Sequence, residues 1–287
     1  MNGPARPAGA GVIAFQGVPG AYSDLACRGA HPEMTTLPCA SFEDTFAALR
    51  EGRADLAMIP VENSLAGRVA DIHHLMPESG MHIVAEHFQR VNHHLLALPG
   101  ATIAGLKTVR SHVQGLSQCR RLIRELGLLP VAAADTAGSA AEVAAGGDPT
   151  VAAIASSLAG EIYGLVSLRA GIEDAEHNTT RFLIMGRDPV DPDPAQPTIT
   201  SLVFRVRSVP AALYKALGGF ATNGVNITKL ESYIIDGSFT VAQFYADVEG
   251  HPDLRPVRLA LEELSFFSRE VRIMGVYPAH PFRRAGA

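Results

Sequence analysis

The segment RDPVDPDPAQPT, from Arg187 to Thr198, divides the chain into two parts that must fold separately. It contains four prolines and three aspartates. Proline has no backbone N–H and interrupts both helices and central strands, so residues 189–197 are predicted to form a linker. A chain of 287 residues is long enough to place a domain on each side.

Upstream of this linker, from residue 11 to 188, short apolar runs alternate with helical patterns. GVIAFQG predicts a strand, and Ser23 is expected to cap the helix that follows. Ser41 is the expected N-cap of a helix that ends at Gly52, and Leu56 to Val61 predicts the next strand. Later, Leu116, Cys119, Ile123 and Leu126 lie at helical spacing before Gly127. This alternation predicts an α/β region with a mostly parallel sheet.

Downstream of the linker the order of elements changes to strand, helix, two strands, helix and strand. TSLVFRVRS predicts the first strand, and a helix follows with Pro210 near its first turn and Gly218 or Gly224 near its end. The two middle strands are joined by a tight turn at Asp236-Gly237. RPVRLALEELSFF predicts the second helix and EVRIMGVYP the last strand. This is the βαββαβ order of a ferredoxin-like domain, expected over residues 198–280.

Composition limits the kinds of partner. A net charge of -5 argues against a nucleic-acid surface, and no apolar run approaches the roughly 20 residues of a membrane helix. Residues 1–10 lack the apolar core of a secretory signal and are expected to be a disordered tail. Three cysteines without CxxC spacing are expected to be buried free thiols in a reducing cytoplasm. The eleven histidines show no HExxH spacing, so no metal site is expected.

Four polar stretches lie at the ends of predicted strands, where ligands bind in open α/β sheets. QGVPGAYS has glycines that free backbone amides near a helix N-terminus, which suits an anion, although the GxGxxG and Walker patterns of nucleotide sites are absent. The other three stretches are PVENSLAG, SHVQG and NTTR. Each of them also fits a helix cap or a solvated surface. Their coincidence at strand ends favours a binding cleft.

Four motifs resemble, in order and spacing, the catalytic domain of prephenate dehydratases. They are IAFQGVPGAYSDLA, ADLAMIPVENSLAGRV, VRSHVQGLSQC and NTTRFLIMGR, and they include the threonine-arginine-phenylalanine signature at Thr180 to Phe182. The resemblance implies two α/β lobes like those of a periplasmic binding protein. Lobe one would comprise residues 11–90 and 176–188, and lobe two residues 91–175. Residues 198–280 resemble the regulatory ACT domain of the family.

The resemblance implies the conversion of prephenate to phenylpyruvate, water and carbon dioxide in phenylalanine biosynthesis, without a cofactor. Thr180, Glu62 and Arg181 are then the expected catalytic residues, with Thr180 and Arg181 pointing into one cleft as leaving-group donor and carboxylate clamp. Asn178 and Thr179 are expected to support the turn. The expected substrate-binding residues are Gly20, Ala21, Tyr22, Ser23, Asn63, Ser64, Ser111, Gln114 and Phe182.

The source of the proton for the leaving hydroxyl has two interpretations. A threonine hydroxyl is a weak acid at neutral pH, so Thr180 would act as an oriented hydrogen-bond donor. Alternatively, Glu62 would relay a proton if burial raises its pKa. Direct hydrogen bonding by Thr180 is the favoured interpretation.

In the C-terminal part, AALY stands where the family has Gly-Ala-Leu-Val, and ESYI where it has Glu-Ser-Arg-Pro. The resemblance implies feedback by L-phenylalanine at an interface between two such domains, and hence a homodimer or homotetramer in the cytoplasm. The expected effector-binding residues are Ala211, Ala212, Leu213, Asn223, Gly224, Val225, Asn226, Glu231 and Ser232. The chain departs from the family motifs at Ala211, in place of the first glycine, and at the Arg-Pro half of the second motif.

Two further functions are compatible with these patterns. The same chemistry on arogenate differs from the prephenate reaction only by an amine in place of a keto group. A non-catalytic sensor, with a small anion in the lobes and an amino acid on the ACT domain, belongs to a different class of protein. The complete signature with Glu62 and Asn63 argues for the enzyme.

Overall fold

The computed structural model describes residues 11–69, 72–207, 209–234 and 242–284. The expected tail at residues 1–10 and the Asp236-Gly237 turn therefore lie outside the described residues. The chain forms two compact units, Met1–Val69 with His87–Phe182 and Ala70–Glu86 with Leu183–Ala287. Strands β5 (His82–Arg90) and β11 (Thr179–Gly186) continue along the chain from one unit into the other. These units divide the chain at other positions than the predicted domains, whose limits stay a prediction.

The first sheet has the strand order β2-β1-β3-β11-β5, with the short β4 (Gly67–Arg68) beside β3. Strand β1 (Val12–Gln16) pairs in parallel with β2 (Thr35–Cys39) and β3 (Leu56–Asn63). Helix α2 (Phe42–Arg50) begins as predicted, because Ser41 Oγ accepts from the Asp44 amide. Helix α1 (Tyr22–Ala30) begins after Ala21, so the prediction that Ser23 caps it is wrong. The Asp24 carboxylate in its first turn instead accepts from the Gly20 amide.

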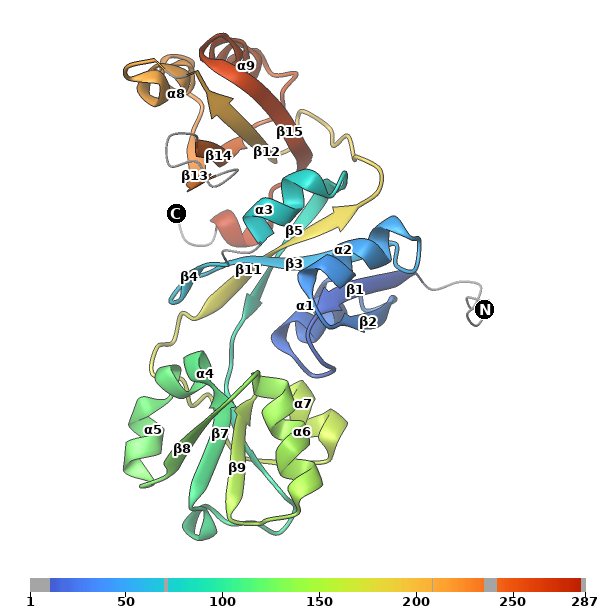
Figure 1. The fold of residues 1–287 in the computed structure, drawn as a ribbon, viewed down its shortest axis with the longest axis vertical. Helices are drawn as coiled ribbons and strands as arrows, with labels where there is room; N and C mark the ends of the chain where they lie inside the picture. Colours follow the sequence, from blue (N-terminus) through green and yellow to red (C-terminus); the bar gives the residue numbers. More distant parts are fainter. Residues whose placement is uncertain (1–10, 70–71, 208, 235–241, 285–287) are drawn as a thin grey trace. The chain divides into compact units, whose positions relative to one another are not determined.

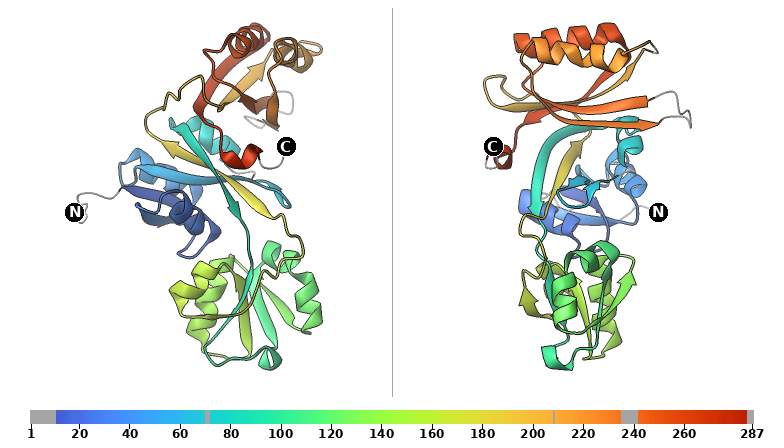
Figure 2. Two further views of the ribbon diagram at one scale, coloured as in Figure 1. Left: turned by 180° about the vertical axis from the view of Figure 1, so that it is seen from behind. Right: turned by 90° about the vertical axis from the view of Figure 1, so that its left-hand side faces the viewer.

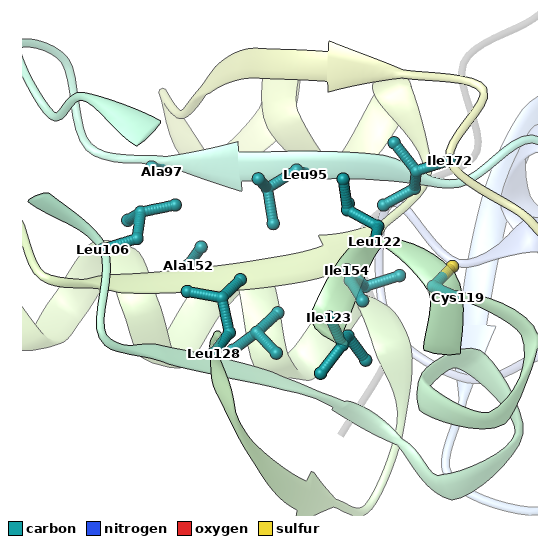
Figure 3. Close-up of a cluster of buried hydrophobic side chains, with 11 residues drawn as sticks. Leu95, Ala97, Leu106, Cys119, Leu122, Ile123, Leu128, Ala152, Ile154 and Ile172 are labelled. Atoms are coloured by element: carbon teal, nitrogen blue, oxygen red, sulfur yellow. The ribbon is translucent and has the colours of Figure 1, made fainter. Parts of the chain in front are cut away.

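The second lobe is built on a five-stranded sheet of order β10-β6-β9-β7-β8. Its strands are β6 (His94–Ala97), β7 (Thr108–His112), β8 (Leu129–Ala133), β9 (Val151–Ala155) and β10 (Val166–Ala170). Its helices are the 3-10 turn η1 (Ile103–Gly105), α4 (Val113–Gln118), α5 (Arg120–Glu125), α6 (Thr136–Gly146) and α7 (Ser157–Tyr163). Figure 1 shows α4 and α5 on one face of this sheet and α6 and α7 on the other. Leu95 and Ile154 are fully buried under α4 and α5 (Figure 3).

The single helix predicted from the Leu116 to Leu126 spacing is two helices, which meet at Cys119. The break has a tertiary cause. Asp174, far along the chain, accepts from the backbone amides of Arg120 and Arg121 at 3.0 and 3.2 Å. A carboxylate at these amides caps the start of a second helix, so the first one ends.

The C-terminal sheet is antiparallel, with the order β13-β14-β12-β15. Its strands are β12 (Thr198–Val206), β13 (Ile227–Ile234), β14 (Ala242–Glu249) and β15 (Ser268–Pro278). Helices α8 (Ala212–Thr222) and α9 (Arg255–Phe267) lie side by side on one of its faces (Figure 2). Beneath them the rings of Phe204 and Phe244 stack at 5.2 Å. Helix α3 (Ile72–Glu78) and the 3-10 turn η2 (Pro281–Arg284) belong to the same compact unit.

The predicted fold class is confirmed: two α/β lobes are followed by a βαββαβ domain. Within that domain Pro210 lies just before the first turn of α8, and Gly218 lies inside the helix. Gly224, at a φ of 67°, follows the helix end. The three cysteines are free and buried, as predicted. None of the helices in the described part of the chain has the length and apolar content needed to cross a membrane.

Candidate active site

Asn63 and Thr180, one from each of two neighbouring strands, form the centre of the polar cluster. Asn63 Nδ2 donates to Thr180 Oγ1 at 3.0 Å and to Asn178 Oδ1 at 2.7 Å. Asn63 Oδ1 accepts from the amides of Leu65 and Ala66 at 3.0 and 2.9 Å. The Asn63 carboxamide is therefore held at both ends. Because Thr180 Oγ1 accepts a hydrogen bond here, its own proton can be donated to another group.

Ser64 ties the same turn to the start of β11. Its hydroxyl donates to the His177 carbonyl oxygen at 2.8 Å and accepts from the Thr179 amide at 3.0 Å. Its amide donates to the Thr179 carbonyl oxygen at 2.9 Å. The Ser64 hydroxyl thus has a structural role in this structure, which differs from the substrate contact expected from the sequence.

Glu62 and Arg181 form an ion pair on the opposite face of these strands. Arg181 Nη1 lies 3.0 Å from Glu62 Oε1, and the Arg181 side chain is 4% exposed. Successive side chains of a strand point to opposite faces, so Arg181 cannot face the same way as Thr180. The expectation that both point into one cleft is therefore wrong. The Glu62 side chain is 34% exposed, so the burial that the proton relay requires is not present either.

The glycine turn before α1 contacts the second lobe. The Gly20 amide donates to Asp24 and the Ala21 amide to the Val18 carbonyl, so neither is available to the anion expected there. A Cβ on Gly20 would lie 2.7 Å from Ala159 Cα of α7. The Gly20 carbonyl oxygen accepts from Ser156 Oγ at 2.6 Å. This turn therefore joins the two lobes, and its part in substrate binding stays a prediction.

Tyr22, from the first turn of α1, also reaches the segment that enters the second lobe. Its hydroxyl donates to the Asn92 carbonyl oxygen at 2.7 Å and lies 2.9 Å from His93 Nδ1. On its other side, His93 Nε2 lies 2.8 Å from Gln118 Oε1 of α4. Burial raises the pKa of the Tyr22 phenol and lowers the pKa of His93. Both groups are therefore neutral near pH 7, and Tyr22 connects the two lobes.

A cavity of about 370 Å³ lies between the turn after β3 and helix α4. It is lined by Leu65, Ala66, Gln114, Ser117, Gln118, Asp174 and Ala175. Of the predicted substrate-binding residues, Gln114 is in this lining. Ser111 is not, because it is fully buried and its hydroxyl donates to the Ile154 carbonyl oxygen at 2.7 Å. Phe182 is also buried, on the same side of β11 as Thr180.

Asn178, expected to support the turn, belongs to the polar cluster. Its side chain is 1% exposed, and its Oδ1 accepts from Asn63. Its Nδ2 has no hydrogen-bond partner within the described residues. A buried donor in that state is uncommon in folded proteins. The sequence signal was the amide two positions before the signature threonine, directly before β11.

The expected effector-binding residues lie around helix α8 and strand β13. Ala211 precedes α8 at a φ of 59°, the one left-handed residue other than glycine in the described chain. The backbone amides of Asn223, Gly224 and Val225 donate to carbonyls of α8, so these amides are not available to a ligand. Glu231 on β13 pairs with Lys229 at 3.1 Å.

Comparison with known proteins gives consistent relatives. The family model described as prephenate dehydratase matches residues 13–190. A bifunctional N-acyl-homoserine lactone acylase/prephenate dehydratase of Komagataeibacter europaeus is 57% identical over 274 residues, covering 95% of this chain and 98% of that protein. Arogenate dehydratase/prephenate dehydratase 1 of Arabidopsis thaliana is 39% identical over 280 residues. The match covers 93% of this chain and 71% of that protein. The solved prephenate dehydratase of Arthrobacter aurescens in complex with L-Phe has a TM-score of 0.84 at 27% identity, covering 96% of each chain.

Proposed function

This chain belongs to the prephenate dehydratase family, and we propose that it converts prephenate to phenylpyruvate, water and carbon dioxide. The ring of prephenate loses a carboxylate and a hydroxyl from opposite ends, and aromatisation drives the reaction. Because no electron or hydride is transferred, the protein has to hold the dianion and stabilise the departing hydroxide.

The hydrogen bond from Asn63 to Thr180 is the observation that carries this proposal. It occupies a lone pair of Thr180 Oγ1 at 3.0 Å, and thereby directs the threonine proton away from Asn63. A fixed hydroxyl of this kind can donate to the leaving hydroxyl of prephenate without reorganising during the reaction. Asn178 holds the Asn63 amide in place at 2.7 Å. Thr180 is therefore the proposed donor, and Asn63 and Asn178 are its positioning residues.

For Glu62 and Arg181 we propose a supporting role. Their ion pair connects β3 to β11 on the face away from Thr180, and the guanidinium is nearly inaccessible. The Glu62 carboxylate is partly exposed at this ion pair, so it is not the buried acid that a proton relay requires. These contacts favour a structural role for the ion pair, in which it supports the site, and not the role of a clamp on a substrate carboxylate. The cavity between the turn after β3 and helix α4 is called the cleft cavity below. Gln114, which lines it, is the proposed contact to the substrate.

The test is direct. Purified protein is incubated with prephenate at neutral pH and phenylpyruvate is measured over time, with arogenate and its product phenylalanine in a parallel series. Absence of both products would refute the enzymatic proposal. A higher kcat/KM on arogenate would assign the chain to the aminated substrate, which the Arabidopsis thaliana relative's name includes.

We also propose that residues 198–280 form an ACT domain that binds L-phenylalanine in a homodimer or homotetramer located in the cytoplasm. The βαββαβ topology and the phenylalanine complex of the Arthrobacter aurescens relative support this assignment. Ala211 takes the place of the family's glycine in a left-handed conformation, which favours glycine. Titrating L-phenylalanine into the dehydratase assay tests the effector binding. Measuring the molar mass by light scattering tests the oligomeric state.

A second candidate function is hydrolysis of N-acyl-homoserine lactones. The relative from Komagataeibacter europaeus bears this activity in its name and is similar over nearly its whole length. In such a reaction water adds to the amide carbon, the C–N bond breaks, and a fatty carboxylate and an ammonium group are released. Incubation with N-octanoyl-homoserine lactone and detection of free homoserine lactone tests it.

A further inference from the structure

The second lobe carries an apolar groove that the dehydration reaction does not use. It has a volume of about 710 Å³, within the usual range of small-molecule sites, and lies between helices α4 and α5 and strand β8. Its apolar wall includes Leu116, Ile123, Leu128, Pro130 and Ala132. We call this feature the α4–α5 groove.

The groove exists because short helices cover an edge strand incompletely. Helices α4 and α5 have six residues each, and β8 is the outermost strand of its sheet. On β8, Pro130 and Ala132 present short side chains on the face that the helices leave open. Ile123 and Leu128 also belong to the buried cluster of the lobe, shown in Figure 3. This part of the groove wall is therefore packed against the hydrophobic core.

The charges at the groove have one sign. Arg120 and Arg124, one helical turn apart, both line it, and no acidic residue does. Neither guanidinium has a hydrogen bond or ion pair within the described residues. Two other arginines of this lobe are paired, Arg110 with Glu142 at 2.6 Å and Arg169 with Glu125 at 2.9 Å. An apolar groove with two unpaired guanidiniums is complementary to a carboxylate that carries a hydrocarbon chain.

We propose that the α4–α5 groove binds a medium-chain fatty carboxylate, with its chain along the apolar wall and its carboxylate at Arg120 and Arg124. Ser117 lines both this groove and the cleft cavity, so only α4 separates the two. A fatty carboxylate is the anion that hydrolysis of an N-acyl amide releases. The biological source of the ligand therefore rests on the proposed acylase function, whereas the binding site rests on the groove itself.

Calorimetric titration with sodium octanoate tests the site. We expect saturable binding of one octanoate per chain, tightening severalfold to about tenfold when decanoate replaces octanoate, because two more methylenes are buried. The double variant Arg120→Gln with Arg124→Gln should weaken binding at least tenfold. Arg121→Gln is the matched control, since Arg121 is exposed on the same helix but does not line the groove.

A filling variant tests the apolar wall independently. Ala132 is exposed on β8, so Ala132→Phe occupies the groove without entering the core, and should abolish octanoate binding while prephenate turnover is unchanged. Absence of saturable octanoate binding would overturn the proposal. Equal weakening in Arg121→Gln and in the double variant, or unchanged binding in Ala132→Phe, would overturn it as well. Octanoate binding without hydrolysis of N-octanoyl-homoserine lactone would retain the site and refute the acylase function alone.

Discussion

The geometry around Thr180 predicts a specific effect of Asn63→Asp. The variant keeps an oxygen that accepts from the amides of Leu65 and Ala66, so the turn after β3 is retained. It replaces the donor 3.0 Å from Thr180 Oγ1 with a second carboxylate oxygen. The Thr180 proton then turns toward the new carboxylate. Asn178 can rotate its unpartnered Nδ2 toward the same carboxylate, which limits the loss of stability.

The size of the effect follows from the hydrogen bond that Thr180 must break before it can donate to the substrate. A hydrogen bond to a charged group contributes about 1.5–3 kcal/mol. At about 1.4 kcal/mol per tenfold in rate, kcat should fall about 10- to 150-fold with little change in KM. Thr180→Val removes the donor altogether and should lower kcat by about 10²–10³. Thr180→Ser keeps the hydroxyl and is the matched control.

A double-mutant cycle decides whether Asn63 acts through Thr180. Initial rates of phenylpyruvate formation give kcat and KM for the two single variants and their combination, and thermal unfolding confirms that each variant is folded. If Asn63 only directs the Thr180 proton, the double variant should lose no more than Thr180→Val alone. Losses that multiply would show that the two residues act independently, and would refute the mechanism. A near-normal kcat for Thr180→Val would remove Thr180 from it.

Three further predictions concern stability. Gly20→Ala should lower the free energy of unfolding by about 2–4 kcal/mol, since φ is 87° and the new Cβ meets Ala159. The control Gly52→Ala, with φ of 73° and no neighbour within 4 Å, should lose only the backbone part, and equal losses would contradict the contact. Burial lowers the pKa of His93 from 6.5, so at lower pH the unfolded chain takes up a proton that the folded chain does not. The free energy of unfolding should therefore fall as the pH drops below about 6.5. His93→Gln should flatten the dependence of Tm on pH between about 5 and 7, and an unchanged slope would exclude His93 as its source. Ala211→Gly should raise the free energy of unfolding by up to about 1 kcal/mol in denaturant titrations, because it relieves a left-handed alanine, and a decrease would argue against that conformation.

The order and type of the elements were predictable because the signals are local. Helix α9 has the predicted bounds, Arg255–Phe267, since its apolar residues repeat at helical spacing after a proline at the second position. Ser41 caps α2 through an amide only three residues away. The opposite facing of Thr180 and Arg181 also follows from strand alternation. The prediction placed both side chains in one cleft, whereas β11 begins at Thr179 and therefore includes both residues.

Only the tertiary structure showed which polar groups are available to a ligand. The break at Cys119 depends on a carboxylate 54 residues away from Arg120, and the Gly20 turn on contact with α7. Asn63 meets Thr180 across 117 residues of sequence. A residue pattern shows which donors and acceptors exist, but hydrogen bonds between distant strands decide which of them are already satisfied. Local periodicity therefore predicted the elements and the candidate residues, while long-range packing determined which residues support the site and which can act on a substrate.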